Sequence, residues 1–177
     1  MSDRPTGEFG LIEWIRARRP RLGPDRGVLG DVGDDCATVR FDGSTAIVTT
    51  DMLMDGRHFV LERDGPEAVG NKAMGVNLSD VAAMCGLPRF AFVAVALPRR
   101  DAEAIGRGLD EGLRRMADRF GVAIVGGDTN AWDGPLVVSV TLLGEPAMAG
   151  AATRSGASAG DVVLVTGPLG GSLFNGR

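Results

Sequence analysis

Apolar residues recur at helical spacing in two segments of the chain, which predicts helices over residues 7–19 and 102–120. A helix between them is predicted over residues 66–85, because Pro66 suits the first helical position and no strong breaker follows before Gly86. Asp101 is the expected N-cap of the third helix, and Gly121 is its expected end. The first and third helices each carry an apolar stripe that a neighbouring element must cover.

Two glycines inside the second predicted helix indicate a close contact. Gly70 and Gly75 each lower the intrinsic stability of a helix by roughly 1 kcal/mol relative to alanine. We therefore expect another element to pack tightly against this helix.

Short apolar runs between the helices predict the strands of a sheet. Residues 37–41 and 44–50 are separated by Asp42–Gly43, a dipeptide that favours a type I′ hairpin turn. Further strands are expected at residues 90–97, 122–125, 136–143 and 161–166. The order of elements predicts an α/β fold of the two-layer α+β kind, with a mixed sheet and helices on one face. We expect one domain over residues 1–150 and the start of a truncated second domain over residues 151–177.

Composition places the chain among folded proteins with a sizeable core. Its 177 residues are 44% hydrophobic and 24% charged, and they include 27 glycines and no tyrosine. The net charge of −4 argues against a broad phosphate-neutralising surface, so nucleic acid is not expected as a partner. No apolar run approaches the roughly 20 residues that span a bilayer, so no membrane association is expected.

The two cysteines indicate a reducing compartment. Cys36 and Cys85 lie far apart and outside any zinc-binding or redox spacing, so we expect two buried thiols. The chain does not open with a charged-then-apolar leader. Both observations predict a cytoplasmic protein.

Carboxylates follow glycine or threonine near several predicted strand ends. They occur in residues 33–35, 49–51 and 126–129, and Asp80 shares a helical face with Asn77. If these oxygens converge, cations must offset their mutual repulsion, and carboxylate and hydroxyl ligands favour a hard ion such as Mg²⁺. Magnesium among carboxylates and glycine turns is typical of phosphate chemistry.

Each of these motifs also has a structural explanation. Asp and Gly are common turn residues, Asp80 fits a solvated helix position, and His58, the only histidine, fits a partly buried side chain. The recurrence of these carboxylate motifs near several strand ends is what favours a metal site. The glycines of residues 167–171 lack the P-loop pattern, and no GxSxG, HExxH or HRD motif is present.

The motifs together resemble those of thiamine-monophosphate kinases, within the group related to aminoimidazole ribonucleotide synthetase. The resemblance rests, in chain order, on VGDDCATV, TTDMLMDGRHF, NKAMGVNLSDVAAMCGLPR, GGDT, GPLVVSVTLLG and TRSGASAGDVVLVTGPLG. It implies ATP-dependent phosphorylation of thiamine monophosphate to thiamine diphosphate, by direct transfer on several Mg²⁺ ions.

The resemblance also implies roles for individual residues. His58 matches a substrate-contacting position, while Gly127, Asp128 and Arg154 match positions that contact ATP. Asp34 would assist at the metal site. The magnesium-ligand positions match Asp35, Thr49, Thr50, Asp51, Asp80 and Asp128. No residue is assigned as a catalytic acid or base.

Members of the family pair through this domain, so the resemblance implies a homodimer with a barrel across the two subunits. The chain departs from the family at residues 130–133, which follow GGDT. Compared with the family, we expect residues 151–177 to be only the start of the second domain.

Two alternatives stay open. One is another member of the wider group, such as aminoimidazole ribonucleotide synthetase or selenophosphate synthetase, although the reactive residue of the latter does not precede Cys36. The other is a non-catalytic dimerisation module.

Overall fold

The computed structural model describes residues 17, 28–30, 35–165 and 167–168. Almost all of the helix predicted over residues 7–19 lies outside these residues, as does Asp34.

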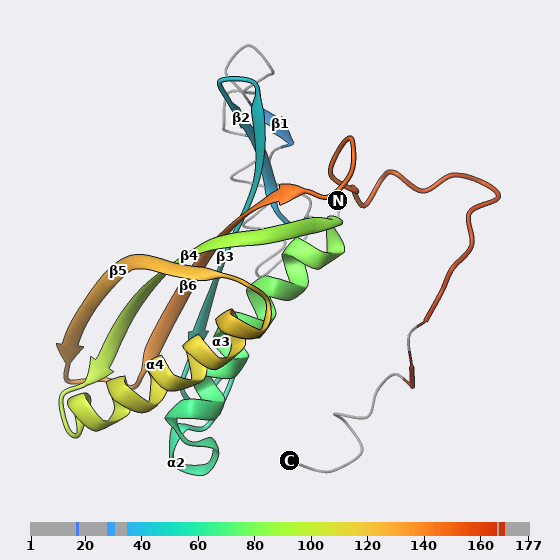
Figure 1. Ribbon diagram of the computed structural model, residues 1–177. Coiled ribbons are helices and arrows are strands. Elements are labelled where there is room, and N and C mark those ends of the chain that lie inside the picture. The colour runs from blue at the N-terminus through green and yellow to red at the C-terminus, as the bar shows by residue number, and fades with distance from the viewer. Residues whose placement is uncertain (1–16, 18–27, 31–34, 166, 169–177) are drawn as a thin grey trace.

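A six-stranded mixed sheet forms one layer of the fold (Figure 1). Its strand order is β1-β2-β3-β6-β4-β5, and every neighbouring pair is antiparallel except β4 and β5. The strands are β1 (Val28–Gly30), β2 (Ala37–Phe41), β3 (Ser44–Met54), β4 (Gly86–Pro98), β5 (Ala123–Trp132) and β6 (Val137–Pro146). The mixed sheet predicted from the sequence is confirmed.

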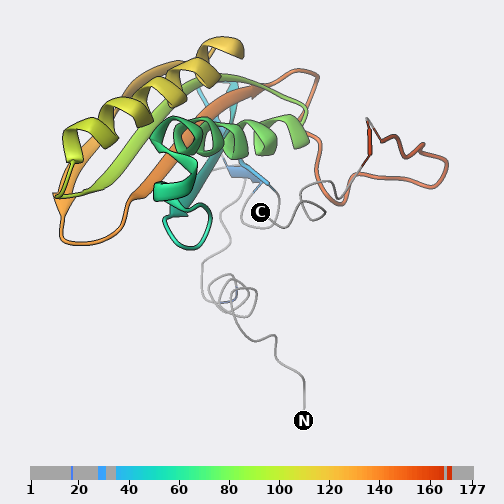
Figure 2. The same ribbon diagram turned by 90° about the horizontal axis from the view of Figure 1, so that it is seen from below.

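Two long helices cover one face of this sheet (Figures 1 and 2). Helix α3 (Pro66–Ala83) packs on β3, β6 and β4, and α4 (Ala102–Arg119) packs on α3, β4 and β5. The core lies between the layers, where Val138, Val140 and Leu142 of β6 are fully buried. The predicted two-layer arrangement with helices on one face is confirmed. Among the described residues, no helix is long and apolar enough to cross a membrane.

The hairpin between β2 and β3 has the predicted turn. Phe41 pairs with Ser44, and the two residues between them have positive φ angles, 45° at Asp42 and 86° at Gly43. Positive φ at both central positions defines a type I′ turn, whose twist matches that of the flanking strands. The local sequence is therefore sufficient to fix this connection.

The predicted close contact on α3 occurs at Gly70 and not at Gly75. A β-carbon at Gly70 would lie 2.2 Å from the carbonyl oxygen of Leu109 on α4. At Gly75 the nearest atom would be Cε of Met116, at an ordinary 3.8 Å. On the α4 side, a β-carbon at Gly112 would lie 2.0 Å from the carbonyl oxygen of Glu67. The backbones of the two helices therefore meet at these glycines.

Four strands, β3 to β6, are longer than predicted, and the longer β3 and β5 move two motifs away from strand ends. Strand β3 continues to Met54 because residues 51–54 still pair with β6, and β5 continues to Trp132 because it pairs with β4 along its whole length. Strand β4 begins at Gly86. Residues 49–51 and 126–129 therefore lie inside strands.

Other predictions were wrong or incomplete. Residues 161–165 form no strand, because the described chain offers them no partner, and Val162–Val165 are exposed. Asp101 makes no side-chain cap, since its backbone is left-handed at φ 60°. The sequence patterns also missed the short strand β1 and helix α2 (Leu61–Asp64).

Candidate functional site

The centre of the candidate site lies between β3 and α3. Alternate residues of a strand share a face, so Thr49 and Asp51 both face the helix layer. The Thr49 hydroxyl donates a hydrogen bond of 2.7 Å to Oδ2 of Asp80. The Asp51 backbone amide donates one of 3.2 Å to Oδ1 of Asn77. Asn77 is fully buried and donates in turn to the Ala73 carbonyl, so the helix side of the site is fixed.

The carboxylates of this site repel one another. Burial raises the pKa of Asp51, the negative charge of Asp80 raises it further, and the electrostatic interaction with His58 opposes both effects. A cation between Asp51 and Asp80 would remove this cost. The three side chains Thr49, Asp51 and Asp80 are referred to below as the oxygen cluster.

The donor set of the oxygen cluster fits magnesium. Mg²⁺ is usually held by one or two carboxylates, with waters and substrate phosphates completing its shell. Within the described residues, no group of three or more His, Cys, Asp or Glu side chains is placed to hold a metal by itself. Two carboxylates and a hydroxyl therefore match a magnesium site that waters and substrate phosphates complete better than they match an all-protein cage.

Asp35, which precedes Cys36 in the chain, is paired with Arg154. The Arg154 guanidinium donates to Oδ1 of Asp35 at 2.6 Å, across 119 positions of sequence. This hydrogen bond is the main reason why the pKa of Asp35 is lowered. Burial raises the pKa of the Cys36 thiol to about 12, and the charges of Asp80 and Asp35 add to the shift. The Cys36 thiol therefore lies within electrostatic range of both Asp35 and Asp80, and it stays neutral.

The two cysteines should differ sharply in reactivity. Cys36 is buried as predicted, but Cys85 is exposed, because it follows the last turn of α3 with φ 51°. We expect a thiol reagent to modify one cysteine in the native chain and two in denaturant, since only the thiolate reacts and Cys36 is both buried and neutral. Peptide mapping should locate the native label on Cys85, and a native label on Cys36 would contradict this geometry.

Thr50 and the GGDT residues lie away from the oxygen cluster. Thr50 faces the opposite side of the sheet, where its hydroxyl lies 3.0 Å from that of Thr141. Asp128 is on β5, with β6 and β4 between that strand and β3, which corresponds to roughly 14 Å at ordinary strand spacing. The amide of Asn130 donates to Asp128 at 2.8 Å. The structure does not bring Thr50 or Asp128 to the cluster within one chain.

Gly127 has a structural reason to be glycine. Its φ is 156°, and a β-carbon there would lie 1.8 Å from the carbonyl oxygen of Val93 on β4. Together with Asp128 it lines a hollow of about 570 Å³ between α4 and the β4–β5 edge of the sheet. The ATP contact implied for Gly127 stays a prediction.

His58 lies in the turn after β3, at the edge of the oxygen cluster. Its Nδ1 accepts a hydrogen bond of 3.0 Å from the Met54 amide. The Nζ of Lys72 donates to the backbone carbonyl of His58. The sequence patterns did not identify Lys72 as a site residue. Its place on α3 about two turns before Asp80, and hence on the same side of the helix, was the available signal.

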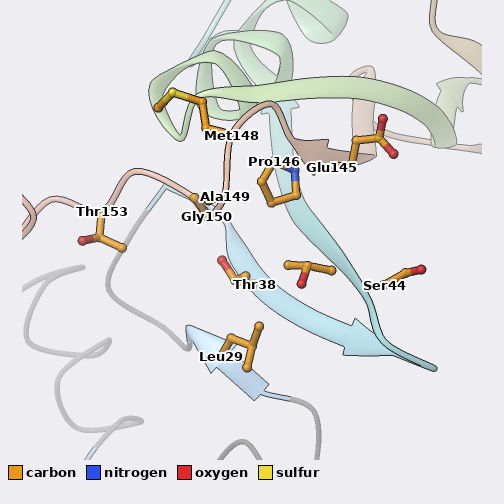
Figure 3. Close-up of a pocket in the computed structure, with 11 residues that line it drawn as sticks. Leu29, Thr38, Ser44, Glu145, Pro146, Met148, Ala149, Gly150 and Thr153 are labelled. Atoms are coloured by element: carbon orange, nitrogen blue, oxygen red, sulfur yellow. The ribbon is translucent and has the colours of Figure 1, made fainter.

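A second hollow lies at the other end of β3, between the β1–β2–β3 strands and the segment after β6 (Figure 3). It has a volume of about 510 Å³, and Leu29 and Thr38 face Pro146 and Met148 across it. Of its described lining residues only Glu145 is ionisable, and it is paired with Arg89 at 2.5 Å. This hollow contains none of the predicted site residues.

Comparison with known families agrees with both the fold and the sequence motifs. The model of the family described as AIR synthase related protein, N-terminal domain, matches residues 33–145. The chain belongs to this family. The match covers the oxygen cluster and the whole sheet from β2 to most of β6.

Relatives of this AIR synthase related domain include named kinases. The thiamine-monophosphate kinase of Rhodopirellula baltica is 38% identical over 94% of this chain and 54% of its own length. That of Bacillus subtilis is 38% identical over 93% of this chain and 50% of its own. A solved structure described as AaThiL complexed with AMPPCP and TMP superposes with a TM-score of 0.73 at 34% identity, over 86% of this chain and 45% of that one. The chain spans about half the length of the curated relatives it matches.

Proposed function

We propose that this chain is the ATP- and Mg²⁺-binding N-terminal part of a thiamine-monophosphate kinase, which transfers a phosphoryl group from ATP to thiamine monophosphate. The observation that carries the proposal is the oxygen cluster, in which Thr49, Asp51 and Asp80 converge from a strand and a helix. The named relatives and the neighbouring structure with AMPPCP and TMP support the same substrates. A cytoplasmic location is part of the proposal.

Phosphoryl transfer requires mainly positioning and neutralisation of charge. Magnesium, when bound, supplies the positive charge that offsets the phosphate oxygens. In this chain Asp51 and Asp80 would hold it, the Thr49 hydroxyl would orient the Asp80 carboxylate, and buried Asn77 would fix the backbone of Asp51. Asp35, Thr49, Thr50 and Asp128 stay proposed ligands, and Gly127 and Arg154 stay proposed ATP contacts.

Replacement of Thr49 by valine tests the cluster with a small change. Thr49→Val keeps the shape of the buried side chain and removes its hydrogen bond to Asp80. We expect Mg²⁺ binding to weaken about tenfold, because hydrogen bonds to charged groups contribute roughly 1.5–3 kcal/mol. Titration calorimetry with Mg²⁺ and AMPPCP measures the change. Thr38→Val is the matched control, because Thr38 on β2 is as buried as Thr49, 7% against 6% exposed, and lines the hollow at the other end of β3. Equal losses of Mg²⁺ binding in both variants would contradict the assignment.

We also propose that a second copy of this chain covers the open face of the sheet. Four large apolar side chains on β3 and β4 point away from the helices, and they are 40–57% exposed. They are Met52, Met54, Phe90 and Phe92. Exposed apolar surface of this kind usually marks an interface. The family resemblance specifies a homodimer as the occupant.

The open face can be tested by its effect on oligomeric state. We expect Phe92→Ser to convert a dimer to a monomer in light scattering after gel filtration, because a polar side chain would replace an aromatic one at the centre of the interface. Phe120→Ser removes a similarly exposed ring, 49% against 44%, from the end of α4 and should leave the dimer intact. A wild-type chain that is monomeric at every concentration would overturn the proposal.

The proposed domain boundary stays near residue 150. Backbone hydrogen bonds from Ala147 to Cys85 and from Ala152 to Met84 still attach this segment to the end of α3. Farther along the chain the apolar side chains of Val162–Val165 are exposed, which supports a second unit in the segment 151–177 that begins after these contacts.

A further inference from the structure

The turn that carries His58 is fixed by hydrogen bonds at both ends. The amide of Asp55 donates to the Leu136 carbonyl at 3.0 Å, and that of Gly56 donates to the Phe59 carbonyl at 2.8 Å. The Asp55 carboxylate accepts from the Leu61 amide at 2.9 Å, at the start of α2. Phe59 is buried and anchors the end of the turn in the core. The turn is therefore a rigid support for an exposed side chain.

The hydrogen bonds of His58 specify where its ring carries a proton. The Met54 amide donates to Nδ1, and the His58 amide donates back to the Met54 carbonyl at 3.0 Å. A ring nitrogen that accepts a hydrogen bond holds no proton, so the neutral imidazole is protonated on Nε2. Nε2–H is then a donor on an exposed ring. This tautomer leaves neither nitrogen free to act as a general base.

Lys72 connects this turn to α3. Its ammonium group donates to the His58 carbonyl, so the backbone of His58 is held by Met54 on one side and by Lys72 on the other. Lys72 is the only lysine of the chain. It lies about two helical turns before Asp80, so the same helix that carries one carboxylate of the oxygen cluster also holds the His58 turn.

We propose that Lys72 and the Met54 amide hold His58 as a fixed Nε2–H donor for a phosphate oxygen of the acceptor substrate, with Lys72 as a positioning residue. A phosphate monoester presents only acceptor oxygens near neutral pH, and a fixed donor at the edge of the carboxylates would orient it without adding negative charge. The identity of the acceptor as thiamine monophosphate rests on the proposed function, whereas the tautomer and the role of Lys72 rest on the geometry of the turn.

The single histidine makes the tautomer directly measurable. In the 177-residue chain labelled with ¹⁵N-histidine, long-range ¹H–¹⁵N spectra should show an unprotonated Nδ1 and a protonated Nε2. Lys72→Met should move both nitrogens toward the averaged shifts of a histidine that exchanges tautomers, and Lys72→Arg should restore the wild-type pattern. Arg57→Met removes a neighbouring charge from the turn and should change neither nitrogen. A wild-type proton on Nδ1, or an unchanged pattern in Lys72→Met, would overturn the proposal.

Binding of thiamine monophosphate separates this inference from the proposed function. With Mg²⁺ present, we expect Lys72→Met to raise the Kd for thiamine monophosphate about tenfold and Lys72→Arg to recover most of the loss. If Lys72→Met raises the Kd without changing the imidazole shifts, Lys72 contacts the ligand itself and the positioning role is wrong. If the wild-type chain has the expected tautomer and binds no thiamine monophosphate, the acceptor and the proposed function fail, while the fixed donor stands.

Discussion

Gly112→Ala should lower the free energy of unfolding by about 3 kcal/mol, at the upper end of the cost of overpacking. The added β-carbon would lie 2.0 Å from the carbonyl oxygen of Glu67 and 3.0 Å from the amide nitrogen of Asn71. Both atoms belong to the backbone of α3, so no side-chain rotation can relieve the clash, and the helices must separate. Denaturation by urea, followed by circular dichroism, measures the change.

Gly75→Ala is the matched control on α3. A β-carbon there meets only Cε of Met116 at 3.8 Å, so the higher helix propensity of alanine should stabilise the chain by about 1 kcal/mol. Changes of opposite sign in the free energy of unfolding of the two variants would support the close contact between α3 and α4 as described. A Gly112→Ala variant as stable as the wild type would show that α3 and α4 do not meet at this point, and the position of Asp80 and Lys72 on α3 would then be in question.

Asp80→Asn should weaken Mg²⁺ binding at least about 100-fold. Even partners outside the inner shell of a metal cost 10–100-fold when they are removed, and Asp80 would be one of two carboxylates in contact with the ion. The asparagine oxygen can still accept from Thr49, so the fold should be preserved. Without Mg²⁺ the variant should be no less stable than the wild type, because Asp51 loses a repulsive neighbour. Titration calorimetry and urea denaturation measure the two effects.

Asp118→Asn makes the same chemical change at an exposed position of α4 and should leave Mg²⁺ binding unchanged. A loss of binding in Asp118→Asn equal to that in Asp80→Asn would indicate a general effect of net charge. Unchanged binding in Asp80→Asn would exclude the oxygen cluster as the metal site.

The sequence was sufficient where the determinant is local. Asp42–Gly43 specifies the hairpin turn because the φ angles of two residues decide it. The predicted end of β3 near Asp51 was wrong for a different reason. Met52 and Met54 are apolar but lie on the open face of the sheet, so the alternation that marks a half-buried strand is lost there. Residues 161–165 have strand composition and no strand, because a strand needs a partner to pair with.

The chemical type of the candidate site was easier to predict from the sequence than the set of residues that lie together in it. The meeting of oxygen atoms at Thr49, Asp51 and Asp80, the proposed ligands, follows from residue type and from the helical spacing of Asn77 and Asp80. The opposite direction of Thr50 follows from strand alternation once residues 49–51 lie inside β3. The distance of Asp128 from the oxygen cluster does not follow from the local sequence. It depends on β6 and β4 lying between β3 and β5, and strand order is set by the whole sheet. Lys72 contacts a backbone carbonyl, so no residue motif marks it, and its position about two helical turns before Asp80 was the one available signal.

The magnesium dependence of nucleotide binding tests the central claim most directly. AMPPCP is titrated calorimetrically into the 177-residue chain with Mg²⁺ present and with Mg²⁺ removed by a chelator. The oxygen cluster predicts saturable heat only when both are present, since two carboxylates without a cation repel the nucleotide phosphates. Equal binding of AMPPCP with and without Mg²⁺, or no binding under either condition, would contradict it.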